Sequence, residues 1–173
     1  MILYPPVHFD GNEWFIIIST LIMWAVVFLL PKRFSFLTML MIWLFNIYIS
    51  QVIDFIIGKP PLLLYYVNDI VEYEYFDALI YLVSYFPTPY FFVYYLDKWR
   101  PKGWWFGGYI LSWSLLTTGF EWITLRFFHV FTWTGWSSLY SFFSYIIIFI
   151  LNVVVLRFVQ RQQKTIIIND NKP

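Results

Sequence analysis

Two carboxylates stand within long apolar stretches of the sequence, and they are the side chains best placed to do chemistry. Asp54 lies near the end of the stretch 36–57, and Glu121 lies in the stretch 103–125. Hydrocarbon does not solvate an ionised side chain, so such residues face other helices or water and mark ion, proton or solute sites. We therefore expect both carboxylates to line one polar pocket.

A polar stripe leads to Asp54 along one helix. At about 100° per residue, Asn46, Ser50 and Asp54 fall on one side of a helix. Lys59 and Arg126 each follow one of the carboxylates five residues later, and the segment 58–75 is expected to roof the pocket. The candidate ligand or proton pocket is formed by six residues: Asn46, Ser50, Asp54, Lys59, Glu121 and Arg126.

A structural role is the alternative for the same residues. Paired ions fix the register of neighbouring helices, and ions near the membrane boundary stay hydrated without binding anything. Asn46 in particular is expected to form a hydrogen bond to another helix.

The sequence carries no recognisable catalytic motif. It has no cysteine, which excludes disulfides, thiolate metal sites and cysteine nucleophiles. Gly58 and Lys59 lack the upstream glycine and the following hydroxyl residue of a phosphate loop. His8 and His129 could share a metal or haem, but they come from a terminus and a turn, and we interpret them as hydrated boundary residues. We predict no catalytic residue, no cofactor and no metal site.

The composition indicates that lipid is the solvent. Of the 173 residues, 61% are hydrophobic and only 12% are charged, against a charged share of about 25% in soluble domains. Phe, Trp and Tyr make up 25% of the chain, and Trp and Tyr favour the boundary between membrane and water. The net charge of +1 and the lack of a basic cluster argue against a nucleic-acid partner.

The apolar stretches predict an all-α integral membrane bundle of five transmembrane helices. Each stretch is long enough to cross about 30 Å of hydrocarbon. They cover residues 14–30, 36–57, 76–96, 103–125 and 138–158. Residues 1–159 then form a single membrane domain, and residues 160–173 form a short polar tail in the cytoplasm.

Two interruptions are expected in this layout. Pro87 and Pro89 each remove a backbone donor from the third helix and should kink it, and the freed carbonyls need partners. The segment 58–75 is too short and too polar to cross, and we interpret it as interfacial. Within it, Asp69 has the sequence signature of a helix N-cap.

The cations orient the chain. If the N-terminus is outside and five spans follow, nine of the eleven Lys and Arg residues lie on the cytoplasmic side, and only Lys59 and Arg126 lie outside. The positive-inside rule favours this arrangement over its inverse. The same threading gathers five of the ten carboxylates outside: Asp10, Glu13, Asp69, Glu72 and Glu74.

Three functions are compatible with these features. The leading one is a non-enzymatic membrane protein whose outer-half pocket handles an ion, a proton or a small solute. The second is a structural or assembly subunit, in which the small-residue face of Gly108, Ser112 and Gly119 docks a second copy or a partner membrane protein. The third is a membrane-embedded hydrolase or transferase that uses Asp54 and Glu121 as paired carboxylates. The lipid bilayer is the partner common to all three.

Several short motifs also carry a resemblance. The layout, the run from Asp54 through Gly58-Lys59-Pro60-Pro61, the Phe86-Pro87-x-Pro89 break and Phe120-Glu121-Trp122 together resemble a family of small multi-spanning membrane proteins of endospore-forming bacteria. The resemblance implies a location in a bacterial plasma membrane. Because that family has no assigned activity, the resemblance implies no catalytic residue.

Overall fold

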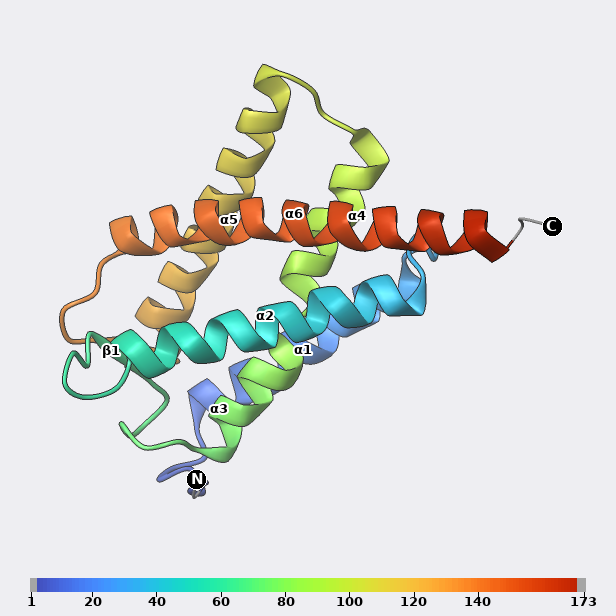
Figure 1. Cartoon of the computed structure of the whole chain (residues 1–173). Coiled ribbons are helices and arrows are strands. Elements are labelled where there is room, and N and C mark those ends of the chain that lie inside the picture. The colour runs from blue at the N-terminus through green and yellow to red at the C-terminus, as the bar shows by residue number, and fades with distance from the viewer. Residues whose placement is uncertain (1–2, 171–173) are drawn as a thin grey trace.

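The computed structural model describes residues 3–170, with side chains described as far as Gln163 and at Thr165. The chain is almost entirely helical. Its elements in order are α1 (Gly11–Leu29), α2 (Phe36–Ile57), β1 (Tyr65–Val67), α3 (Tyr75–Leu79), a π-helical turn η1 (Ile80–Ser84), α4 (Pro87–Trp99), α5 (Trp104–Phe128), β2 (Phe131–Trp133) and α6 (Ser138–Asp170). The N-terminus and β1 lie at one end of the molecule, and the C-terminus lies at the other (Figure 1).

The long helices begin and end where their capping residues allow. The bounds of α2 are those predicted, because the Ser35 hydroxyl accepts the Thr38 N–H at 3.2 Å and Gly58 ends the helix. Helix α1 begins at Gly11, three residues earlier than predicted, since Asp10 and Glu13 form a capping box that satisfies the first backbone donors.

The predicted third helix is interrupted, and the interruption lies on the N-terminal side of the prolines. Pro87 begins α4, a position at which the missing N–H costs nothing. The preceding turn is π-helical, and Tyr85 donates its N–H to the Ile80 carbonyl at 2.9 Å. The Val83 carbonyl, which Pro87 cannot serve, accepts the indole N–H of Trp24 at 3.0 Å. The bundle therefore supplies the partner that the proline removes.

One predicted local feature is wrong. No helix starts at Asp69; instead, helix α3 starts at Tyr75, where the Glu74 N–H donates to the Asp77 carboxylate at 3.1 Å. Residues 160–170 of the predicted tail are helical and continue α6. The continuation packs because the Gln163 amide donates to the Ser35 hydroxyl at 2.7 Å. The rest of the predicted tail, residues 171–173, lies outside the described residues.

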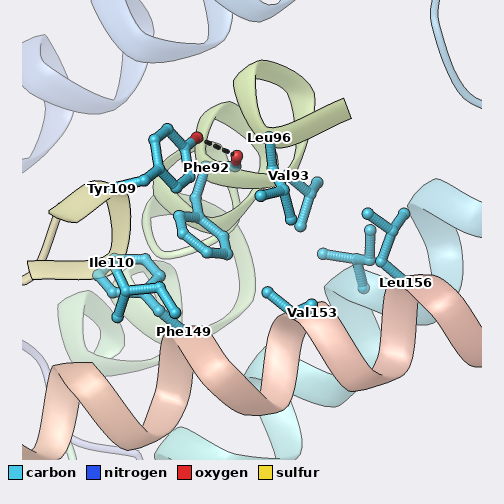
Figure 2. Close-up of a cluster of buried hydrophobic side chains, with 9 residues drawn as sticks. Phe92, Val93, Leu96, Tyr109, Ile110, Phe149, Val153 and Leu156 are labelled. Atoms are coloured by element: carbon cyan, nitrogen blue, oxygen red, sulfur yellow. Dashed lines mark hydrogen bonds between the residues drawn. The ribbon is translucent and has the colours of Figure 1, made fainter. Parts of the chain in front are cut away.

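The core forms where α6 crosses α2, α4 and α5. Figure 2 shows its central cluster, in which aromatic and branched side chains from these helices interdigitate, and the Tyr109 hydroxyl donates to the Phe92 carbonyl at 2.6 Å. The buried members are Ile42, Phe92, Val93, Leu96, Tyr109, Ile110, Phe149, Val153 and Leu156. A reciprocal amide pair joins α2 to α6 beside this cluster: Asn46 and Asn152 each donate to the other, at 2.8 and 3.1 Å. The interhelical hydrogen bond expected for Asn46 is therefore present.

The outer surface of the helices is apolar. Helices α1, α2 and α6, the last over Ser138–Gln163, are each long and apolar enough to cross a membrane. Large side chains on the surface stay exposed, including Leu29 at 83%, Phe36 at 78% and Trp104 at 97%. A soluble protein rarely exposes so much contiguous apolar surface. These helices indicate that the protein associates with a membrane.

Candidate functional site

A cavity of about 240 Å³ lies inside the helical bundle, toward the end that carries the strands. Every helical segment except α3 contributes to its wall, and most lining side chains are apolar. Four of the six predicted pocket residues line it: Asn46, Ser50, Asp54 and Glu121. The structure thus brings the Asp54 and Glu121 carboxylates, from α2 and α5, to one space.

Asp54 is placed by the end of its helix. Gly58 donates its N–H to the Asp54 carbonyl at 2.9 Å, and a Cβ at position 58 would lie 3.0 Å from that oxygen, so a larger residue would crowd this turn. After Gly58 the chain turns back toward the end of α2, and the Tyr65 hydroxyl of β1 donates to Asp54 Oδ1. Burial and the neighbouring carboxylate raise the pKa of Tyr65 well above its ordinary value, so Tyr65 remains a donor. Asp54 Oδ2 is buried and has no hydrogen bond within 3.5 Å, although the Tyr81 hydroxyl lies close to the same carboxylate.

The Glu121 carboxylate accepts a hydrogen bond at both of its oxygens. Its Oε1 accepts the Ser141 hydroxyl at 2.7 Å, and its Oε2 accepts the Tyr145 hydroxyl at 2.6 Å. Both donors come from α6, one turn apart on the face turned toward α5. The Trp136 indole N–H donates to Ser141 at 2.8 Å. The chain of bonds fixes the Glu121 carboxylate in one orientation at the cavity wall.

The two predicted cations do not line the cavity. Lys59 turns away, donates to the Val71 carbonyl and lies over the Tyr73 ring, 4.0 Å from its centroid. Burial lowers the pKa of Lys59. Arg126 is exposed on the outside of α5. Within the described part of the chain, neither Asp54 nor Glu121 forms an ion pair with these cations, so the expected charge pairing is wrong. The ion pair found there joins Arg33 to Asp97 at 2.7 Å.

Two paired strands close the cavity at this end. Strand β1 runs antiparallel to β2, with Tyr65 opposite Trp133 and Val67 opposite Phe131. The Leu64 carbonyl accepts three successive N–H groups, from residues 134–136, at 2.9 to 3.0 Å. Tyr65, Phe131, Trp133 and Trp136 of these segments reach the cavity. The roof of the cavity is therefore built from two loops, the one after α2 and the one after α5. The sequence predicted only the loop after α2.

Three residues that hold the carboxylates were missed by sequence reasoning: Tyr65, Ser141 and Tyr145. Ser141 and Tyr145 are four residues apart and so share one helix face, and that spacing was available as a signal. Tyr65 carries no comparable signal, because its position depends on a turn and on a strand partner far away in the sequence.

The small-residue face of α5 points away from the cavity. Gly108, Ser112 and Gly119 are all exposed. A Cβ added at either glycine would meet no atom within 4 Å. The face therefore packs against no other helix of this chain over the described residues.

The chain was also compared with protein-family models, with curated proteins and with solved structures, and nothing matched. The chemical role of the site is therefore inferred from the positions and types of its side chains. An apolar cavity with two fixed carboxylates and no paired cation is suited to binding a positively charged or proton-donating group.

A wet cavity makes a direct prediction about thiol reactivity. The chain has no native cysteine, so single cysteines can be introduced without background. Cysteine at Ser50, on the cavity wall, should react in native membranes with a small water-soluble methanethiosulfonate, because a thiolate forms only where water reaches. The control is Ser112→Cys on the exposed face of α5, which should stay unreactive in lipid.

Both variants should react fully once denatured, which shows that each thiol is intact. A Ser50→Cys protein that reacts only after denaturation would contradict a water-accessible cavity.

Proposed function

We propose that the chain is a five-span integral protein of a bacterial plasma membrane, and that its cavity binds a small, mainly apolar solute with one positive charge. The N-terminus is outside and the C-terminus is cytoplasmic in this proposal. One observation carries it: two carboxylates, Asp54 and Glu121, line one apolar cavity, and neither forms an ion pair among the described residues. A cationic group of a ligand would balance their charge.

The five passes are supported by the path of the chain. Besides the three apolar spans, the broken helix over residues 75–99 and the 25-residue α5 run through the same bundle, and an odd number of passes agrees with termini at opposite ends (Figure 1). The cation distribution supports the orientation. The bacterial location follows from the resemblance of the Gly58–Pro61 and Phe86–Pro89 motifs.

The two carboxylates differ in what they offer a ligand. Glu121 already accepts a hydrogen bond at each oxygen, so part of its acceptor capacity is used within the protein. Asp54 accepts one hydrogen bond within 3.5 Å, from Tyr65, and so has more capacity left. The ligand's cationic group is therefore expected to lie against Asp54, with its apolar part against the aromatic and branched residues of the wall.

Replacement of the carboxylates should separate these roles. Asp54→Asn should weaken binding of phenethylammonium, a small aromatic cation with N–H donors, by at least about tenfold, which corresponds to one lost charge-assisted contact of about 1.4 kcal/mol. Glu121→Gln should cause a smaller loss. The measurement is equilibrium dialysis with purified protein in nanodiscs.

The matched control is Glu72→Gln, which removes an exposed carboxylate in the 58–75 segment. Gel filtration and circular dichroism must show that the variants are folded. The proposal fails if the wild-type protein does not bind the cation, or if folded Asp54→Asn binds it as tightly as wild type.

A second candidate function is supported by the face formed by Gly108, Ser112 and Gly119. This face is exposed, and nothing lies within contact of its glycines, as expected of a surface that receives a helix of a second copy or of a partner membrane protein. Gly108→Leu together with Gly119→Leu should reduce the size of the assembly in lipid, measured by cross-linking. An unchanged assembly would remove this candidate and leave the cavity proposal standing.

A further inference from the structure

A second group of carboxylates lies apart from the cavity, at the outer end of α1. Glu13 comes from the first turn of α1, Asp69 from the loop after β1, and Glu74 from the residue before α3. One carboxylate oxygen of each lies within 4.8 Å of the other two. None of the three belongs to the cavity wall.

The cluster holds buried acceptors without partners. Glu13 and Glu74 are both 0% exposed. Neither oxygen of Glu74 has a hydrogen bond within 3.5 Å, although its side chain faces the Asp77 N–H at the start of α3, and Glu13 Oε1 has none either. A buried polar atom without a partner costs about 1–3 kcal/mol, and more when it is charged. Such atoms mark a missing ligand unless the carboxyls share protons.

The remaining oxygens are fixed by local hydrogen bonds. Glu13 Oε2 accepts the Asp10 N–H at 2.7 Å. Asp69 accepts the Asn12 side-chain amide at 3.2 Å and the His8 N–H at 3.1 Å. These bonds position two of the three carboxylates before any ligand arrives, which is how a preorganised ion site is built.

No cation of the described chain neutralises the cluster. The ion pair found among the described residues joins Arg33 to Asp97 at the other end of the molecule. Lys59, the basic residue of the neighbouring loop, is engaged with the Val71 carbonyl and the Tyr73 ring. Three carboxylates therefore face one another without a counter-ion.

We propose that Glu13, Asp69 and Glu74 form a binding site for a hard divalent cation, and that the cation is Ca²⁺. All ligand atoms are carboxylate oxygens, which Ca²⁺ and Mg²⁺ prefer over transition metals. Ca²⁺ accepts about six to eight oxygen ligands in flexible geometry, which suits three carboxylates that come from three separate segments. Mg²⁺ requires near-ideal octahedral geometry and releases its water reluctantly.

The ion would join three segments that meet at this end of the fold. The segment before α1 already pairs with the segment before α3. Tyr4 donates its N–H to the Tyr73 carbonyl at 2.8 Å, and Tyr75 donates its N–H to the Tyr4 carbonyl at 3.0 Å. A ligand that binds only the folded protein stabilises it in proportion to its concentration above Kd. Calcium is therefore expected to stabilise the outer end of the bundle.

Proton sharing is the competing explanation for the cluster. Burial and the carboxylates of Asp77, Asp69 and Glu13 raise the pKa of Glu74 to about 7. Calcium binding should therefore be measured at pH 8, where Glu74 is ionised and the two explanations give opposite results.

The experiment uses the full chain in nanodiscs, stripped with EDTA at pH 8. Adding CaCl₂ up to 10 mM should raise the Tm, with an affinity near the range of about 10⁻⁴ to 10⁻³ M that is typical of extracellular sites. Luminescence of Tb³⁺, excited through neighbouring tryptophan, should appear and should be displaced by Ca²⁺. Glu74→Gln and Asp69→Asn should each weaken the response to CaCl₂ by more than tenfold, while Glu72→Gln should leave it unchanged.

Three outcomes overturn the proposal. The first is a wild-type Tm at pH 8 that does not respond to CaCl₂. The second is a folded Glu74→Gln variant that responds as wild type. The third is a Glu74→Gln variant that is more stable than wild type at pH 8 with or without CaCl₂, which assigns proton sharing to the cluster. Displacement of Tb³⁺ by equimolar Mg²⁺ as effectively as by Ca²⁺ overturns the choice of ion.

Discussion

Hydrocarbon offers no hydrogen-bond partners, and this constraint explains most polar contacts inside the bundle. Asn46 and Asn152 satisfy each other across two helices. Trp24 serves the carbonyl that a proline leaves free. An interhelical bond of this kind contributes about 0.6 kcal/mol on average in membrane proteins. The larger effect is on specificity, because each pair is satisfied in only one register of the helices.

Asp54 is an exception to this pairing of buried polar groups. Its neighbours satisfy one oxygen and leave the other buried without a hydrogen bond within 3.5 Å. The strands β1 and β2 tie the loop after α2 to the loop after α5, so the roof carries Tyr65 to the carboxylate. The same end of the molecule holds the cluster of Glu13, Asp69 and Glu74. Among the described residues, the unsatisfied carboxylate oxygens of Glu13, Asp54 and Glu74 thus gather at one end, on the side proposed to be outside.

Local periodicity was enough to predict the parts of the fold that depend on neighbours in sequence. The bounds of α2, the stripe from Asn46 to Asp54 and the interruption before Pro87 all follow from spacing and chain stereochemistry. The convergence of Asp54 and Glu121 was inferred from the cost of charge in lipid. The strand pair and the acidic cluster escaped prediction, because the two strands, and Glu13 and the other two carboxylates, are more than 50 positions apart in sequence, and no local pattern encodes such a meeting. Lys59 was misplaced for a related reason: after Gly58 the chain leaves the helix, and helical spacing no longer describes it.

The central claim is that lipid surrounds the helices and that the chain threads it an odd number of times. The most direct measurement labels single cysteines with an impermeant maleimide in intact spheroplasts of a bacterial host. We predict that Thr134→Cys, exposed on the roof, is labelled from outside, and that Gln162→Cys, exposed near the end of α6, is labelled only after permeabilisation. Labelling of both from the same side, or recovery of the protein from the soluble fraction, would contradict the account.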